Sequence, residues 1–364
     1  MATTETNGTN GTIFTTQHAI RQHEHGRLAV DADAPMPFLP PNGILVRTVA
    51  VALAPTDYKM PEKFPTPGVV SGCDFAGTIV KIGSEVERPL KAGDRVFGGI
   101  HGANPAEPTS GSFAEYLVAD AEFVFLVPED MPWETAAAMS GIGIGTTGLA
   151  IFYYLKPPGT LEKPAEKPVT VLVNGGATAS GTMAIQLLRL AGLNPIATCS
   201  PKNNDLVTSY GASAVFSYHD DNCAALIRSH TKNALKYVLD CVATASAIEL
   251  CHAAIGRLGG TYIALEMPPP LANERKTVKT DWCLGMSLLG KEIQLGDGYG
   301  MPANEEHHRF GIQLYGTVQR LLDEGKLRAH PVRMVEGGLQ GVLDEGLGLL
   351  RAQKVSAQKL VAFI

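Results

Sequence analysis

The sequence predicts a two-domain α/β fold in which a partly open antiparallel β-barrel is followed by a doubly wound parallel sheet. One reason is the length, because 364 residues suit two domains better than one. A second is the series of short strands with Gly and Pro turns over residues 13–128, which is typical of a small barrel. The third is the stretch 168–203, which combines a buried strand, a glycine turn, a helix and a second strand.

The strands of the barrel are predicted from their alternation of apolar and polar residues. Residues 13–30 indicate a hairpin, and Gly43–Leu53 alternates clearly enough for a half-buried strand. Ala54–Lys59 and the prolines that follow it predict an irregular loop, of the kind that carries functional residues. Further strands are predicted at residues 77–83, 94–97, 111–118 and 123–127.

The rest of the chain alternates helices and strands. Pro132 begins an Ala-rich helix, residues 142–154 continue as an apolar helix, and the charged, proline-rich residues 156–167 predict an exposed insertion. The parallel strands are predicted at Val169–Val173, Asn194–Thr198, Ala214–Phe216, Tyr237–Leu239 and Gly260–Leu265. An amphipathic helix is predicted at Glu305–Leu322 and a strand–helix–strand unit at 331–364. We therefore expect a disordered tail at 1–12, a first domain of residues 13–150 and 305–364, and a second domain of residues 151–304.

Composition and charge argue against several classes of protein. A hydrophobic content of 45% with 18% charged residues describes a well-buried soluble protein. A net charge of −6 without a cluster of Lys and Arg argues against a nucleic-acid partner. The six cysteines lack C-x-x-C spacing, which favours free thiols in a reducing compartment. No apolar run approaches about 18 residues and the polar N-terminus lacks a signal-peptide core, so we expect a cytoplasmic protein without membrane association.

The turn after Val173 is a candidate dinucleotide site. Gly175, Gly176 and Gly181 lead into a helix expected at Thr182–Leu190. The N-terminus of such a helix attracts a pyrophosphate, because its N–H groups and its dipole favour negative charge. The register Gly175-x-x-Thr178-x-x-Gly181 departs from G-x-G-x-x-G, so the motif alone fits a turn without a ligand equally well.

The end of the second strand predicts which dinucleotide binds. NAD usually needs an acidic residue there for its ribose hydroxyls, and this chain has no carboxylate before Asp205. Ser200 can donate to a phosphate oxygen and Lys202 supplies a positive charge, so we expect NADPH; the alternative is an ordinary exposed lysine. Tyr218 is a candidate to stack on adenine, or else a surface or core tyrosine. The cofactor segment is expected to comprise Thr198, Cys199, Ser200, Pro201 and Lys202.

Five stretches carry a resemblance to a known family: APTDYKM at 54–60, PIATCSPKN at 195–203, LDC at 239–241, AAIGRLGGTYIAL at 253–265 and TDWCLG at 280–285. With the order of elements, they resemble the medium-chain dehydrogenase/reductase superfamily, whose members join a GroES-like barrel to a Rossmann domain. Within it, the chain is most similar to the trans-acting enoyl reductases of fungal highly reducing polyketide synthases. The resemblance covers nearly the whole chain.

The resemblance raises the question of zinc, because some members of the superfamily are zinc-dependent alcohol dehydrogenases. Their catalytic zinc takes a cysteine in the loop after the first long strand and a histidine in a Gly-His-Glu sequence. Here these positions hold Pro55 or Thr56 and the stretch Gly72-Cys73-Asp74, which leaves Cys73 without spaced partners for three ligands. Residues 100–112 contain no cysteine for a structural zinc lobe. We expect no metal.

The resemblance also implies the chemistry, which is hydride addition to the β-carbon of an enoyl thioester. The resulting enolate needs a hydrogen-bond donor at its oxygen and a proton at its α-carbon. The expected donor is Lys59, in the loop that faces the nicotinamide in this family; a solvated surface lysine is the alternative. Thr56 and Thr146 are candidates to orient the nicotinamide or the thioester, with Thr146 and Lys59 as the catalytic pair. In the same loop, Tyr58 is expected to shape the pocket and Asp57 to brace the backbone near the cofactor.

The remaining contacts of cofactor and substrate are expected by the same resemblance. The pyrophosphate would lie against Gly175, Gly176, Ala177 and Thr178, with the Thr178 hydroxyl bonded to a phosphate oxygen, and the nicotinamide end against Ile263, Ala264, Val355 and Ser356. The acyl pocket is expected between the domains. Its walls would comprise Thr146, Thr147, Gly148, Leu149, Ala150, Ile151, Phe152 and Tyr153, together with Leu284, Gly285, Met286, Ser287 and Leu288. The alternative for most of these residues is a place in the core.

A partner and an oligomeric state are also expected. The acyl substrate would be presented by a highly reducing polyketide synthase, alone or fused to a peptide synthetase. Met267–Pro270 follow the strand Gly260–Leu265, and because proline lacks the N–H that edge pairing needs, we expect a monomer. Two alternatives to the synthase-dependent reductase are a free-standing NADPH quinone or alkenal reductase and an NADPH-binding accessory protein without activity.

Overall fold

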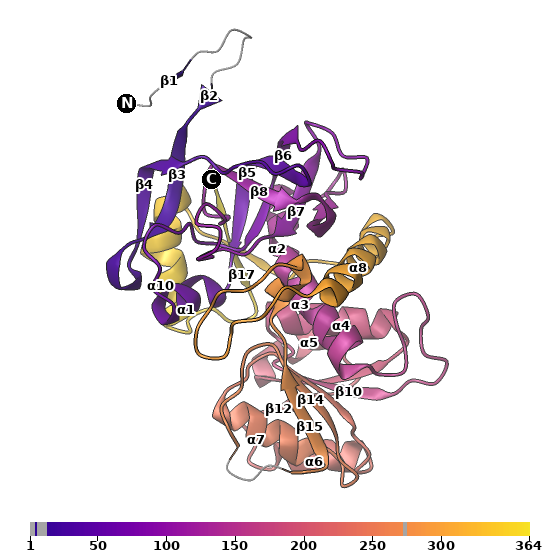
Figure 1. The fold of residues 1–364 in the computed structure, drawn as a ribbon. Coiled ribbons are helices and arrows are strands. Elements are labelled where there is room, and N and C mark those ends of the chain that lie inside the picture. Colours follow the sequence, from indigo (N-terminus) through magenta and orange to yellow (C-terminus); the bar gives the residue numbers. More distant parts are fainter. Residues whose placement is uncertain (1–3, 6–12, 272–274) are drawn as a thin grey trace. The chain divides into compact units, whose positions relative to one another are not determined.

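The computed structural model describes residues 4–5, 13–271 and 275–364 (Figure 1). It contains two compact units. The β unit comprises Met1–Ile142, Leu289–Asn304 and Gln319–Ile364, and the α/β unit comprises Gly143–Leu288 and Glu305–Val318. Of the tail expected at 1–12, residues 1–3 and 6–12 lie outside the described residues, and β1 (Thr4–Glu5) pairs with β2 (Ile13–Phe14).

The β unit is built around its longest strand, β5 (Gly43–Leu53), as the alternation predicted. A seven-stranded sheet runs in the order β16-β17-β5-β6-β7-β9, and β8 pairs with β5. Its other strands are β6 (Asp74–Ile82), β7 (Arg95–Gly99), β8 (Tyr116–Asp120), β9 (Val124–Leu126), β16 (Val332–Met334) and β17 (Lys359–Phe363). The predicted hairpin is β3 (Thr16–Gln22) with β4 (Leu28–Pro35), joined by η1 (Glu24–Gly26). The barrel-like half of the prediction is confirmed.

The segment predicted as an irregular loop at Ala54–Lys59 is instead the start of helix α1 (Thr56–Lys63). The Asp57 carboxylate accepts a 2.7 Å hydrogen bond from the N–H of Ala54 and closes the first turn. The prolines that suggested a loop are compatible with the helix. Pro55 stands at the N-cap, and Pro61 costs this two-turn helix only one backbone hydrogen-bond donor.

The apolar stretch after Pro132 is helical, as predicted, but in three segments. They are α2 (Trp133–Ala138), α3 (Gly141–Gly148) and the π-helix η3 (Leu149–Leu155). Together they form the one helical stretch of the described chain that is long and apolar enough to cross a membrane, with a mean hydropathy of 1.4. The stretch is 72% buried inside the protein, as a core helix is.

The α/β unit contains the predicted doubly wound sheet. Six parallel strands lie in the order β12-β11-β10-β13-β14-β15, so the order reverses between β10 and β13. The strands are β10 (Thr170–Asn174), β11 (Asn194–Cys199), β12 (Val215–Ser217), β13 (Tyr237–Asp240), β14 (Gly260–Ala264) and β15 (Val278–Trp282). The helices between them are α4 (Ala179–Leu190), α5 (Asn204–Ser209), α6 (Cys223–His230) and α7 (Ala245–Ala254), with η4 (Pro201–Asn203) before α5. Sheets of this order bind ligands at the carboxyl ends of the strands beside the reversal.

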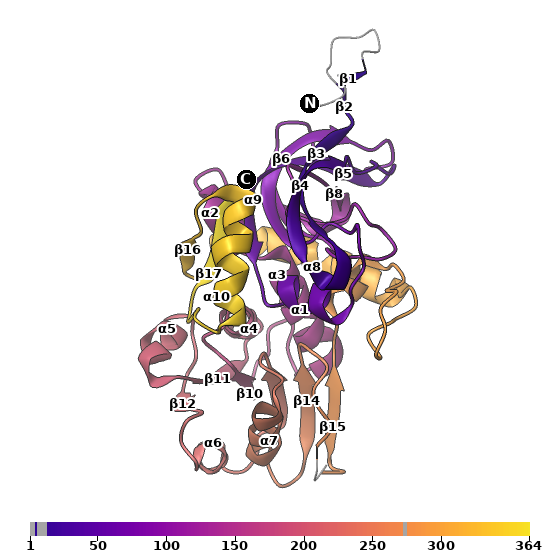
Figure 2. The ribbon, with the colours of Figure 1, turned by 90° about the vertical axis from the view of Figure 1, so that its left-hand side faces the viewer.

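Strand β15 was not predicted, and it changes the argument about edge pairing. It lies parallel to β14 and forms the end of the sheet (Figure 2). Its sequence, VKTDW, is too polar to predict a buried strand, which is consistent with an edge position where only Val278 is fully buried. Pro268–Pro270 therefore lie in a connection and not beside an edge strand, so the premise of the monomer prediction was wrong.

The C-terminal region completes both units. Helix α8 (Glu305–Asp323) is amphipathic, as predicted, and η5 (Gly285–Leu289) is a short turn of 3-10 helix. The expected strand–helix–strand unit is β16, the helical run α9 (Gly338–Gly341), η6 (Val342–Gly346) and α10 (Leu347–Arg351), and β17. In Figure 2 this helical run lies beside β17, and Leu347 and Leu360 belong to one hydrophobic cluster.

Candidate active site

The glycine turn lies at the carboxyl end of β10, beside the point where the strand order reverses. Gly175 adopts a φ of +79°, which favours glycine. Its N–H donates to the Thr198 hydroxyl at 3.1 Å, and the N–H of Gly176 donates to the Thr198 carbonyl at 2.8 Å. A Cβ at Gly176 would lie 2.7 Å from Ala197 Cβ. The turn is therefore held flat against the end of β11, where only glycine fits.

Thr178 is the N-cap of α4, which begins at Ala179 and not at Thr182 as predicted. Its hydroxyl accepts from the N–H of Gly181 at 2.9 Å and donates to the carbonyl of Gly175 at 2.8 Å. The expected bond from this hydroxyl to a phosphate oxygen is therefore not favoured, because its proton is already used. A Cβ at Gly181 would overlap the Gly175 carbonyl oxygen, so the third glycine permits close packing of helix and turn. The N–H groups of the first turn of α4 are suited to hold a pyrophosphate.

A buried polar network lies next to the glycine turn, inside the protein, and supports it. The Asp240 carboxylate, which is fully buried, accepts from Asn174 Nδ2 at 2.8 Å and from the Tyr262 hydroxyl at 2.7 Å. Backbone N–H groups donate to it from Val242 and Ala243. Burial beside Asp240 raises the pKa of Tyr262, so its hydroxyl stays a donor. The Thr198 hydroxyl joins the network at Asn174, which shows that Thr198 supports the site from inside the protein.

Ser200 and Tyr218 meet at the ends of neighbouring strands β11 and β12. Their hydroxyl oxygens are 2.7 Å apart, and Ser200 Oγ is also 3.3 Å from His219 Nε2. Lys202 is exposed on η4, two residues beyond Ser200. The sequence analysis missed His219, although its position next to Tyr218 at a strand end could have indicated it. These four side chains offer hydroxyl, ammonium and imidazole donors to an anion.

The neighbouring Cys199 differs from the rest of the cofactor segment. It is 1% exposed, and its thiol lies 3.3 Å from Asn204 Oδ1. Burial raises the pKa of this thiol to about 11, so it stays a neutral thiol, and its proton is donated to Asn204 and not to a phosphate. Pro201 is exposed beside Lys202.

The expected nicotinamide residues Ile263 and Ala264 lie in β14, on the other side of the point where the strand order reverses. Their side chains are fully buried, which leaves their backbone groups to contact a cofactor.

Helix α1 carries the expected catalytic segment of the β unit. Lys59 is exposed, whereas Thr56 and Tyr58 are half-buried. Asp57 is 3% exposed, and its carboxyl group accepts from the N–H of Ala54 at the start of the helix. It therefore braces the backbone of this segment, as predicted. Burial raises the pKa of its carboxyl group to about 7.

The structure brings α1 together with the expected nicotinamide segment at Val355 and Ser356. Tyr58 and Val355 belong to the same hydrophobic cluster, and Ser356 is exposed next to it. The Arg351 guanidinium lies 5.4 Å from the centre of the Tyr58 ring and donates to Glu62 Oε1 at 2.6 Å. Tyr58 and Glu62 lie far in sequence from Arg351, Val355 and Ser356, so tertiary packing alone brings them together.

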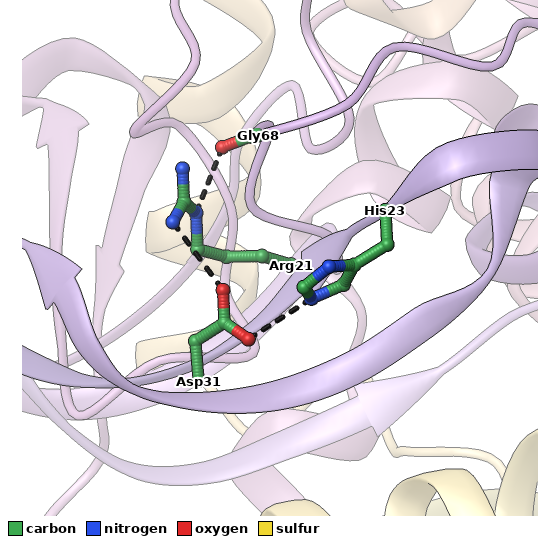
Figure 3. Close-up of polar contacts among 4 residues, drawn as sticks. All are labelled: Arg21, His23, Asp31 and Gly68. Carbon is green, nitrogen blue, oxygen red and sulfur yellow. Dashed lines mark hydrogen bonds and ion pairs between the residues drawn. The ribbon is translucent and has the colours of Figure 1, made fainter.

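The hairpin β3–β4 holds the chain that follows α1. Arg21 Nε donates to the Gly68 carbonyl at 2.9 Å, and the Asp31 carboxylate bridges Arg21 and His23, at 3.3 and 3.0 Å (Figure 3). Gln22 is buried, donates to the Pro61 carbonyl at 2.6 Å and accepts from the N–H of Thr66 at 2.7 Å. The sequence analysis did not anticipate this anchor for the end of α1.

The two predicted walls of the acyl pocket meet within the α/β unit. A Cβ at Gly285 would overlap Thr146 Oγ1, so the two segments approach as closely as a glycine allows. The partly exposed members of the walls are Thr146, Phe152, Tyr153, Leu284 and Gly285. The buried members are Thr147, Gly148, Leu149, Ala150, Ile151, Met286, Ser287 and Leu288. The Thr147 hydroxyl donates to the Gly143 carbonyl at 2.6 Å, which is the arrangement of a core residue in a helix.

The positions considered for zinc do not fit a zinc site. Cys73 is buried beside the Asp57 carboxyl, and burial raises the pKa of its thiol well above the usual value. The next residue, Asp74, is occupied by a buried ion pair with Lys359 at 3.0 Å and by the Ser140 hydroxyl at 2.6 Å. Across the described part of the chain, no group of three or more His, Cys, Asp or Glu side chains could hold a metal ion. No step of the reaction is therefore assigned to zinc.

Two family models match the chain. The alcohol dehydrogenase GroES-like domain matches residues 40–129, and the zinc-binding dehydrogenase model matches residues 179–288. Solved structures share the fold. CurK enoyl reductase has a TM-score of 0.71 at 19% identity and covers 96% of this chain and 99% of its own. A mycobacterial protein complexed with NADPH has a TM-score of 0.72 at 20% identity and covers 96% and 100%.

Curated relatives match at higher identity. Trans-enoyl reductase ccsC of Aspergillus clavatus is 46% identical over 351 residues, which cover 96% of this chain and 96% of the relative. Trans-enoyl reductase RAP2 of Pyricularia oryzae is 48% identical over 343 residues, which cover 94% and 97%. This chain is therefore a member of the medium-chain dehydrogenase/reductase superfamily and belongs, within it, to the trans-enoyl reductases.

Proposed function

We propose that this protein is a trans-acting enoyl reductase that uses NADPH to reduce the α,β-double bond of polyketide acyl thioesters. The acyl chain would be carried by a partner highly reducing polyketide synthase, alone or fused to a peptide synthetase, in the biosynthesis of a secondary metabolite. The observation that carries the proposal is the identity of 45–48% to several proteins named trans-enoyl reductase, over almost their whole length.

The choice of NADPH rests on the side chains at the ends of β11 and β12. An adenosine 2′-phosphate would be met by Ser200, Tyr218 and His219, with the charge of Lys202 close by in sequence. Charge-assisted hydrogen bonds to a phosphate are roughly twice as strong as neutral ones. The ribose hydroxyls of NAD would find no carboxylate at this strand end. The glycine turn and the N-terminus of α4 would hold the pyrophosphate of either cofactor.

The proposed mechanism assigns separate tasks to the chain's own residues. When bound, NADPH would supply the hydride that adds to the β-carbon of the enoyl thioester, and a proton from solvent or an acidic side chain would complete the reduction at the α-carbon. Lys59 would donate a hydrogen bond to the thioester oxygen, where negative charge develops. Asp57 anchors the start of α1 and Gln22 anchors its end, so the backbone that carries Lys59 is fixed. Thr146 would orient the thioester with its hydroxyl.

We propose that the protein acts in the cytoplasm, which its six free cysteines favour, and that it is a monomer. The edge strand β15 has exposed Lys279 and half-buried Asp281, and charged side chains on an edge oppose strand pairing between copies. A monomer elutes from size exclusion at the volume expected for 38.6 kDa at micromolar concentration; a dimer would contradict this.

The test of the function is the oxidation of NADPH by the purified protein with two kinds of acceptor. A crotonyl pantetheine thioester should be consumed with formation of the butyryl thioester, which mass spectrometry identifies. A quinone consumed much faster than any enoyl thioester would favour the free-standing reductase. Tight NADPH binding with no turnover of either acceptor, even when the synthase is added, would favour the accessory protein.

A further inference from the structure

Three hydrogen-bonded side chains, two of them buried and one half-buried, form a chain that links α8, η5 and η3 in the α/β unit. His307, on α8, is 4% exposed and Ser287, on η5, is 3% exposed. His307 Nδ1 is 2.8 Å from Ser287 Oγ, and His307 Nε2 is 3.4 Å from the hydroxyl of Tyr154, on η3. Neither His307 nor Tyr154 is among the residues expected to form the walls of the acyl pocket.

The direction of each hydrogen bond follows from the donors and acceptors present. Ser287 Oγ–H donates to the Leu284 carbonyl at 2.8 Å, so the same oxygen accepts from His307 Nδ1–H. His307 Nε2 then carries the lone pair and accepts from the Tyr154 hydroxyl. Burial lowers the pKa of His307, which favours this neutral ring, and burial raises the pKa of Tyr154 to about 12, which keeps its hydroxyl protonated.

The chain joins the two segments that form the candidate pocket walls. Tyr154 belongs to the π-helix η3, whose earlier residues form one wall, and Ser287 belongs to η5 in the other. The chain ends on the carbonyl of Leu284, next to Gly285, where the backbone approaches the Thr146 hydroxyl as closely as glycine allows. A substitution of His307 would therefore change the distance between Thr146 and residues 284–288.

Aromatic packing holds the histidine ring in this position. The Tyr153 and His307 rings meet edge to face with 4.6 Å between their centres, and the Tyr153 hydroxyl donates to Glu306 at 2.8 Å. Because the ring is packed and bonded at both nitrogens, it has little freedom to turn. A rigid link between two walls is suited to setting the width of a pocket.

We infer that His307 is a positioning residue that sets the acyl-chain preference of the enzyme by fixing the distance between η3 and η5. The inference rests on the proposed function, because it takes these two segments as the walls of the acyl pocket. His307 would act through Ser287 and Tyr154, which makes it a positioning residue and not a catalytic one. Its effect is on which acyl chains fit and not on the chemical step.

The test compares a butenoyl and a decenoyl pantetheine thioester in the wild type, His307→Leu and Tyr154→Phe. We expect the ratio of the two kcat/KM values to move toward one by about threefold or more in both variants, since small changes in an apolar pocket alter specificity by such factors. NADPH affinity should stay within about twofold. Because both variants break one chain, Tyr154→Phe should add little in the His307→Leu background.

Controls separate this inference from a general loss of structure and from the proposed function. His308→Leu changes the next residue of α8 and should keep the wild-type ratio. If His307→Leu does not fold, the ratio of kcat/KM values measured for Tyr154→Phe tests the inference by itself. An unchanged ratio, an equal loss for both substrates, or a wild type without chain-length preference would overturn the inference. A wild type that reduces neither thioester would instead overturn the proposed function.

Discussion

The hydroxyl oxygens of Ser200 and Tyr218 lie 2.7 Å apart, although the residues are separated by 18 positions in the chain. They meet because β11 and β12 are parallel neighbours, with Cys199 in register with Ser217, and each residue directly follows its strand. Two hydroxyl groups at one point, with Lys202 close in sequence, make an anion site more favourable than a site for neutral ribose hydroxyls.

The charge of Lys202 should discriminate between the two cofactors. Lys202→Gln removes the ammonium group, so we expect the Kd for NADPH to rise by about tenfold, as for the loss of one hydrogen bond to a charged group. The Kd for NADH should hardly change, because NADH has no 2′-phosphate. Fluorescence titration with both cofactors measures this. Lys163→Gln, in the exposed insertion, is the control, and an equal effect of Lys202→Gln on both cofactors would contradict the prediction.

Tyr218 can act through its hydroxyl or through its ring, and two variants distinguish these roles. Tyr218→Phe removes only the group bonded to Ser200, so it should weaken NADPH binding by several-fold, about 1 kcal/mol, and leave NADH binding unchanged. Tyr218→Ala should also weaken NADH binding if the ring stacks on adenine. Isothermal titration with both cofactors gives the answer. Normal NADPH binding by Tyr218→Phe would show that the hydroxyl has no part in the site.

Gly181 should be intolerant of a side chain. In Gly181→Ala the new Cβ would overlap the Gly175 carbonyl oxygen, which is backbone and cannot move aside cheaply. We expect a loss of about 1–3 kcal/mol in unfolding free energy and weaker binding of both cofactors. Urea denaturation and cofactor titration measure the two effects. Gly316→Ala on α8 meets nothing within 4 Å and should be neutral or stabilising; a similar loss there would remove the steric explanation.

Asp57 should make stability depend on pH. Its pKa is raised from 3.8 to about 7 by burial, so the folded state binds this proton more tightly than the unfolded chain. The contribution of Asp57 to the unfolding free energy therefore falls by up to about 4 kcal/mol as pH rises from 3.8 to about 7. Above about pH 7 this contribution no longer changes.

Asp57→Asn should remove this part of the pH dependence, because the amide does not ionise and its oxygen still accepts from Ala54. Urea unfolding of variant and wild type between pH 5 and pH 8 measures the difference. Asp94→Asn is a matched control, because Asp94 accepts from the N–H of Lys91 in the same i−3 arrangement but is only half-buried. Parallel pH curves for wild type and Asp57→Asn would refute the buried-proton explanation.

Lys59 should matter for turnover and not for binding of the cofactor. Lys59→Ala removes the proposed donor to the thioester oxygen, and we expect kcat/KM for an enoyl thioester to fall by about a hundredfold. The Kd for NADPH should stay near the wild-type value. Lys63→Ala, on the same helix, removes an ammonium that lies 4.2 Å from the centre of the Tyr299 ring and should keep activity. Full activity of Lys59→Ala would exclude the proposed role.

Local patterns were sufficient where a residue's neighbours in sequence decide its structure. The alternation of Gly43–Leu53 predicted β5 at its observed bounds, and the β-branched run at Val169–Val173 predicted β10 within one residue. The same reasoning failed at α1, because a carboxylate that caps its own turn outweighs the prolines around it. It failed again at β15, because an edge strand is buried on too little of its surface to show an apolar pattern.

The sequence by itself determined the order of strands and helices, the glycine turn, the absence of an acidic residue after the second parallel strand and the place of Ser200 and Lys202. Each of these depends on residues within about one element of each other. Only the tertiary structure decided that Tyr218 and His219 meet Ser200 and that His307 links Tyr154 to Ser287. The physical reason is that these contacts depend on strand register and helix packing, which join residues that no local pattern relates.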